Sequence, residues 1–230
     1  KLRVRFSLDN LKLNDDVLNI PLTAESMEGY TVENEKMRFL TVDVQKGHFW
    51  HTVYAVDDSG KFHLLSAGRL ETLDDVEKKQ DEFSIPDHCV ALDSGYDTDA
   101  VRKICGLHKW FSMNGTIKDE YIHKIKGRGI KMMHAPLEWH IVEGVKCAHF
   151  NFSSQRAKDV LAAMIKSGKM KVPYDVPKEY IKQMQAESKQ EFIDKRTGRV
   201  SLKWFASGNN SHMLDCSCMA VMLGMIYRLI

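Results

Sequence analysis

Three aspartates occupy positions where an unpaired carboxylate would be costly. Asp43 interrupts an apolar, β-branched segment, Asp93 follows the apolar run 90–92, and Asp215 lies in the first turn of the most apolar predicted helix. A buried carboxylate is unfavourable unless it is paired or binds a metal. Carboxylates that converge repel one another, and hard cations such as Mg²⁺ and Mn²⁺ prefer oxygen ligands. The three residues therefore predict a divalent-metal site if the fold brings them together.

Each aspartate also has a simpler interpretation. Asp43 could end a strand and pair with a lysine, Asp93 could cap the next helix, and Asp215 could be a first-turn acid favoured by the helix dipole. The order of first strand, later strand and final helix favours a shared site, because two adjacent strands and a helix packed over them can meet at one point. Two divalent ions about 4 Å apart could there activate a water and stabilise the leaving oxygen in phosphodiester hydrolysis.

The elements that must position these acids form a mixed α/β pattern. Apolar or alternating segments predict strands at 38–44, 49–56, 62–67, 89–92, 121–125 and 139–147. Helices are predicted at 72–83, 97–107, 153–165, 177–189 and 213–229, and a hairpin at 192–204. Val101, Ile104 and Leu107 share one face of the second helix. Three consecutive strands followed by alternating helices and strands predict an α/β fold with one central mixed β-sheet flanked by helices.

The composition fits one generous folded domain. Of the 230 residues, 43% are hydrophobic and 28% charged, and the net charge is +2. Any contact with DNA must therefore come from a local basic patch rather than from global charge. We assign residues 1–37 to a flanking or linker segment and residues 38–230 to the domain. We find no run of about 18 apolar residues and so expect no membrane contact.

The cysteines and the start of the chain indicate the cellular context. Five cysteines, an odd number without CxxC spacing, argue against a disulfide framework and against a zinc site. This usage fits a reducing cytoplasm. The chain opens with neither a signal peptide nor a methionine, which we interpret as a fragment of a longer protein.

A basic segment between Lys118 and Lys131 is the best candidate for phosphate contacts. It also holds Lys124, Lys126 and Arg128, with two glycines between them. A solvated charged loop is the alternative to a patch that contacts DNA phosphates. Lys126 and Arg128 are the residues that we expect to bind DNA.

Several segments, in order, resemble the nuclease domain of phage terminase large subunits, in the branch that includes the lambda enzyme. They are residues 40–45 (LTVDVQ), 92–98 (LDSGYDT), 124–127 (KIKG, similar to the family's next strand), 180–187 and 213–216 (MLDC). The resemblance runs from about residue 38 to about residue 224. One departure is Ser211-His212, where family members often carry Asn-Glu.

The resemblance implies an RNase H-like fold and two Mg²⁺ or Mn²⁺ ions as cofactors. It implies that Asp43, Asp93 and Asp215 are the catalytic, metal-binding acids, with Asp43 shared by both ions. Further residues would surround these ligands: Ser94, Tyr96, Asp97 and His212.

We therefore expect an endonuclease that cuts concatemeric double-stranded DNA during phage genome packaging, in the host cell cytoplasm. The expected partners are the terminase small subunit, the portal protein and the packaging ATPase domain of the same polypeptide. No GxxxxGK[ST] phosphate loop occurs in this chain, so it would be the nuclease half.

Two alternatives stay open. One is another RNase H-like enzyme, such as a Holliday-junction resolvase or a transposase. The other is a non-catalytic module that grips DNA or docks on the portal, which would not need a metal.

Overall fold

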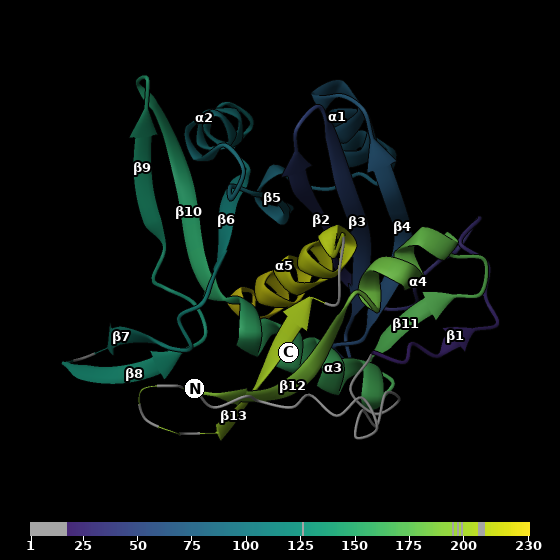
Figure 1. Ribbon diagram of the computed structural model, residues 1–230. Helices are drawn as coiled ribbons and strands as arrows, with labels where there is room; N and C mark the ends of the chain where they lie inside the picture. The colour runs from purple at the N-terminus through teal and green to yellow at the C-terminus, as the bar shows by residue number, and fades with distance from the viewer. Residues whose placement is uncertain (1–17, 126, 195, 197, 199, 207–209) are drawn as a thin grey trace.

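A nine-stranded mixed sheet forms the centre of the molecule (Figure 1). The computed structural model describes residues 18–125, 127–194, 196, 198, 200–206 and 210–230. The strand order is β1-β11-β4-β3-β2-β5-β6-β10-β9. The strands are β1 (Leu22–Thr23), β2 (Glu35–Gln45), β3 (His48–Asp57), β4 (Phe62–Leu70), β5 (Val90–Asp93), β6 (Phe111–Thr116), β9 (Glu138–Val142), β10 (Val145–Ser153) and β11 (Met170–Pro173).

Helices cover both faces of this sheet. Helices α1 and α2 lie on one face, and α3, α4 and α5 lie on the other (Figure 1). The helices are α1 (Leu73–Glu82), α2 (Thr98–His108), α3 (Ser154–Lys166), α4 (Lys178–Met184) and α5 (His212–Ile226). Two antiparallel hairpins stand outside the sheet: β7 (Tyr121–Ile125) with β8 (Arg128–Met132), and β12 (Glu187–Ile193) with β13 (Val200–Ala206).

The first three long strands form the predicted antiparallel meander. Gly47, with φ 80°, allows the tight turn between β2 and β3. Between β3 and β4, the Asp57 carboxylate accepts backbone N–H bonds from Ser59 at 2.8 Å and Lys61 at 3.0 Å. These local bonds close the turn that the sequence Asp-Asp-Ser-Gly indicates.

The second half of the sheet is mainly parallel. β5 runs parallel to β2, β6 parallel to β5, and β10 parallel to β6. Asp97 caps α2, which connects β5 to β6, by accepting the N–H of Ala100. An antiparallel meander extended by parallel strands, with helices on both faces, confirms the predicted RNase H-like α/β fold.

The strand next to β5 differs from the prediction. It is β6, at residues 111–116, which the sequence pattern did not reveal, whereas the predicted strand at 121–125 pairs with β8 outside the central sheet. The resemblance of residues 124–127 to the family's next strand is therefore wrong. Strand β6 was not predicted because it carries Ser112, Asn114 and Gly115 and so lacks an apolar pattern.

The single strand predicted at 139–147 is a hairpin. Val142 of β9 pairs with Val145 of β10, and the two residues between them have positive φ, 47° at Glu143 and 81° at Gly144. Two such residues make the two-residue turn that suits the twist of paired strands. A glutamate in this position concealed the turn, because Asn or Gly is the usual signal.

Two smaller expectations also need correction. The helix predicted at 177–189 ends at Met184, and β12 already begins at Glu187. In α2 the buried side chains are those of Val101 and Cys105, whereas Leu107 is 62% exposed. Strand β11 was not predicted.

Residues 18–34 pack with the domain, although the sequence assigned them to a flanking segment. Leu18 and Ile20 are buried in the core, and Leu22 pairs with Val172 of β11. Residues 1–17 lie outside the described residues.

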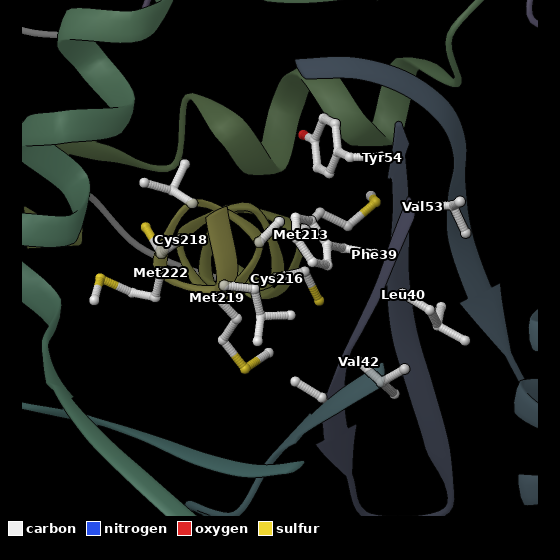
Figure 2. Close-up of a cluster of buried hydrophobic side chains, with 14 of the residues drawn as sticks. Phe39, Leu40, Val42, Val53, Tyr54, Met213, Cys216, Cys218, Met219 and Met222 are labelled. Carbon is white, nitrogen blue, oxygen red and sulfur yellow. The ribbon is translucent and has the colours of Figure 1, made fainter. Parts of the chain in front are cut away.

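Helix α5 is buried on nearly all sides, as its sequence predicts. Figure 2 shows Met213 and Cys216 on the side of the helix that faces Phe39 of β2, and Cys218 and Met222 on the other side. Helix α5 packs between the sheet and α3. None of the helices within the described part of the chain is both long and apolar enough to span a membrane.

Candidate active site

The register of the central strands brings two of the predicted acids together. In the parallel pair of β2 and β5, Val42 lies opposite Leu92, so Asp43 and Asp93 follow on adjacent positions of neighbouring strands. Thr41, two residues before Asp43, donates a hydrogen bond to the Cys216 carbonyl of α5. Because side chains alternate along a strand, Asp43 and Asp93 both point toward the face that α5 covers.

Helix α5 brings the third acid to the same place. Asp215, in its first turn, lines a cavity of about 210 Å³ together with Asp43 and Asp93. The cavity is completed by Gly95, Asn114, Gly115, Phe152, Ser154 and Met219. The three acids therefore share one cavity. The cap of α2 is Asp97, so the interpretation of Asp93 as a helix cap is wrong.

Asp43 is held by two hydrogen bonds. It is 5% exposed, and its Oδ2 lies 2.5 Å from His212 Nδ1 and accepts a bond from Gln45 Nε2 at 3.0 Å. The His212 ring stacks on Trp50, with centroids 5.9 Å apart. The hydrogen bond to Asp43 raises the pKa of His212, against the opposing effect of burial. Asp43 is therefore oriented by an imidazole, not by the lysine that the simpler interpretation required.

Asp93 lacks a cationic partner among the described residues. Its Oδ2 accepts the backbone N–H of Gly95 at 3.0 Å. Burial, and next the charge of Asp43, raise the pKa of Asp93 to about 7. Burial and the neighbouring carboxylates thus disfavour the charged form of Asp93.

Asp215 has a cation beside it. Its Oδ1 lies 3.5 Å from Lys158 Nζ, and its Oδ2 accepts a bond from Ser211 Oγ at 3.2 Å. Burial raises the pKa of Asp215 above its usual value, Lys158 opposes this shift, and Glu187 and Asp43 add to it. The side chain is 41% exposed, so a ligand that enters the cavity can reach it.

The family comparison agrees with this geometry. The chain matches the family model of the terminase large subunit gpA endonuclease domain over residues 20–229. It belongs to this family. No curated protein and no solved structure matches the chain. Membership in the gpA endonuclease family supports a nuclease role in phage DNA packaging.

The residues expected around the acids of this gpA nuclease domain lie in different settings. The Ser94 hydroxyl donates to the Met113 carbonyl at 3.1 Å, Tyr96 is 56% exposed, and Asp97 caps α2. Among these four residues, the His212 side chain forms a hydrogen bond with a carboxylate of the site, that of Asp43.

The predicted DNA-binding residues belong to the β7–β8 hairpin. Lys126 lies outside the described residues, and Arg128 is exposed at the start of β8. Lys131 of the same hairpin lies 2.7 Å from Glu120. Part of the basic cluster is therefore neutralised by the protein itself, whereas Arg128 faces solvent.

The donor set suits a hard divalent cation. Three carboxylates border the cavity, and the pKa of Asp93 and of Asp215 is raised by burial and by neighbouring acids, as expected where a cation would relieve repulsion. In the described part of the chain, no three His, Cys, Asp or Glu side chains already form a compact ligand group. The gpA aspartates thus border a shared space instead of meeting at a single point.

Two residues near the site were not predicted as site residues. Lys158 of α3 and Glu187 of β12 are both buried, and Lys158 Nζ lies 2.6 Å from Glu187 Oε1. Asp215 and Glu187 raise the pKa of Lys158 although burial lowers it, so the net shift is upward. The sequence did offer one signal for Lys158. It lies among the apolar positions of a helix, beside Ala157 and Leu161, where a lysine is unusual unless it is paired.

Proposed function

We propose that this domain is a divalent-metal-dependent endonuclease that cuts concatemeric double-stranded DNA during phage genome packaging. The observation that carries the proposal is the single cavity in which β2, β5 and α5 each place one aspartate. The three acids include no nucleophile of their own, so they suit hydrolysis by an activated water.

Asp43 would be shared by two Mg²⁺ or Mn²⁺ ions, and Asp93 and Asp215 would each hold one. When bound, the ions would activate a water and stabilise the leaving oxygen. The chain supplies the orientation of the ligands. Gln45 and His212 hold Oδ2 of Asp43, the Gly95 N–H holds Asp93, and Ser211 holds Oδ2 of Asp215.

DNA would reach the cavity past the β7–β8 hairpin, with Lys126 and Arg128 contacting phosphates. We propose low intrinsic sequence selectivity, because cutting would be directed by partners. These are the terminase small subunit, the portal protein and the packaging ATPase domain of the same polypeptide, in the host cell cytoplasm.

A non-catalytic module that grips DNA or docks on the portal is the second candidate. It is favoured by the partners that Asp43 and Asp215 already have in the His212 imidazole and the Lys158 ammonium. Membership in the gpA family favours a terminase over another RNase H-like enzyme such as a resolvase.

Cleavage of supercoiled plasmid by the purified chain separates the two candidates. We expect slow, sequence-nonspecific nicking and linearisation with Mn²⁺ or Mg²⁺, suppressed by EDTA and by moderate salt, and unaffected by ATP. Cleavage that persists in EDTA would contradict the mechanism. The absence of both cleavage and metal binding would favour the docking module.

A further inference from the structure

Lys158 is a buried cation that lies between two carboxylates. Its side chain is 8% exposed, and its Nζ lies 2.6 Å from Glu187 Oε1 and 3.5 Å from Asp215 Oδ1. A buried ammonium is strongly destabilising when its carboxylate partner is removed. The fold therefore favours keeping Lys158 paired with Glu187. Glu187 is equally buried and is not among the residues that line the cavity. A fixed positive charge therefore stands directly beside one of the three cavity acids.

The other acids of the cavity are not balanced in this way. Asp93 forms no ion pair within the described residues and accepts a backbone N–H from Gly95. Asp43 is bonded through Oδ2 to Gln45 and His212. The two pairs of carboxylates that could each bind a cation therefore differ in their surroundings. Asp43 with Asp93 is free of a fixed ammonium, whereas Asp43 with Asp215 has Lys158 beside it.

We propose that Lys158, anchored by Glu187, is a built-in counter-ion of Asp215 that makes the two cation positions of the site unequal. The position between Asp43 and Asp93 binds a divalent cation tightly. The position at Asp215 binds one weakly, because the ammonium repels the ion and competes for Oδ1. The added negative charge of a DNA phosphate would favour filling of this second position. This inference rests on the proposed nuclease function and deepens it.

Mn²⁺ binding to the purified chain without DNA tests the inference independently of cleavage. Electron paramagnetic resonance of free Mn²⁺ gives both the number of bound ions and their affinities. For the unmodified chain we expect one ion bound at least about tenfold more tightly than the second, since a fixed unit charge a few ångströms away acts on one position.

Two substitutions are expected to shift the second ion in opposite directions. Lys158→Met removes the competing charge and should tighten the second ion by about tenfold. Glu187→Gln removes the anchor, leaves the ammonium to Asp215 alone, and should weaken the second ion by a similar factor. The first ion should change less than the second in either variant, because Lys158 lies beside Asp215 and the Coulomb energy falls with distance. Lys158→Arg keeps the charge and is the conservative control, with binding close to that of the unmodified chain.

Opposite signs distinguish the counter-ion from a purely structural lysine, whose loss would weaken binding through disorder. If Lys158→Met does not fold, the double variant K158M/E187Q removes both charges together. Its second ion should still bind more tightly, because the ammonium 3.5 Å from Asp215 Oδ1 is then absent. An unchanged second ion in that variant would count against the inference.

The failure of the inference differs from the failure of the proposed function. Two ions of equal affinity in the unmodified chain, or shifts of the same sign in K158M and E187Q, would overturn the inference and leave the nuclease intact. A chain that neither binds Mn²⁺ nor cleaves DNA would overturn both.

Discussion

The two faces of the central sheet bury polar groups with different consequences. On the α5 face, burial and the charge of Asp43 raise the pKa of Asp93 to about 7. On the face covered by α1 and α2, burial lowers the pKa of both His51 and His149 to about 4. Burial thus favours the neutral form on both faces. The α5 face also has a cavity, where an entering cation can stabilise the charged form of the acids.

This comparison indicates what separates a binding site from a buried polar residue. His51 Nε2 lies 3.0 Å from the Ser66 hydroxyl, and His149 Nδ1 lies 3.0 Å from that of Ser112. The other ring nitrogen of each histidine is buried without a partner among the described residues. Burial keeps these histidines neutral, whereas the cavity on the α5 face gives a cation access to the acids.

The largest effect is expected from removing an acid on the α5 face. Asp43→Asn should reduce plasmid cleavage on the order of 10³-fold or more, because the shared ligand is lost. The melting temperature should stay the same or rise slightly, because one of the repelling charges is gone. Gel assays of supercoiled plasmid and thermal unfolding measure the two effects.

A matched control is Asp99→Asn, an exposed acid in the first turn of α2. It should retain cleavage. Unmodified cleavage rates in D43N would remove Asp43 from the catalytic machinery.

The second prediction concerns the histidine face at acidic pH. The folded-state pKa of His51 and of His149 lies below the unfolded value of about 6.5, so the unfolded chain binds more protons. Stability is then fully present above that value and is lost as the pH falls from about 6.5 toward 4. Each histidine contributes up to about 3 kcal/mol to this loss. His51→Gln should flatten the decline measured by urea unfolding at several pH values.

The exposed His88 provides the comparison. His88→Gln should leave the acid decline unchanged, and an equally steep decline in H51Q would mean that His51 does not cause it. Asp93 acts in the opposite sense, because a carboxyl with a raised folded-state pKa stabilises the fold as the pH falls through about 7.

The third prediction uses the metal to raise stability on the α5 face. Mn²⁺ at about 100 times its Kd should stabilise the fold by about 2.7 kcal/mol, which corresponds to roughly 5–10 °C in melting temperature for a domain of this size. Asp93→Asn should lose most of this increase, because it removes a ligand of the tighter ion. An equal increase in D93N would exclude Asp93 as a ligand.

The smallest effect is expected at the β7–β8 hairpin, away from both faces. Arg128→Ala should weaken DNA binding equally for all sequences and reduce the salt slope by about one unit. Lys126→Ala is predicted to do the same. Lys131→Ala should change the slope less, because Glu120 already pairs with Lys131. An unchanged salt dependence in R128A and K126A would assign these residues to a solvated loop.

The sequence predicts the parts of the fold that follow from local pattern. The meander β2–β4, the cap of α2 and the buried α5 all carry apolar periodicity or turn residues that determine local structure. Asp43, Asp93 and Asp215 could be singled out because each contrasts with apolar neighbours. The order of their elements was sufficient to predict that they share a site.

The parts that could not be predicted depend on contacts between distant residues. Strand β6 has polar residues facing inward, and its strand conformation is imposed by β5 and β10 on either side. Lys158 and Glu187 meet across 29 positions of sequence, a separation that no local spacing rule covers. The family resemblance included Glu187 within a helix and so gave no hint of this pairing.

The burial of every cysteine makes the thiols natural reporters of opening. All five are free and buried, and burial raises the pKa of Cys89 to about 11. A thiol reagent needs an accessible thiolate, so it can react only when the surrounding structure separates. Cys216 and Cys218 lie in α5 with Asp215, whereas Cys105 lies in α2 and Cys147 in β10. The labelling rate at each cysteine would therefore show which layer of the molecule opens first.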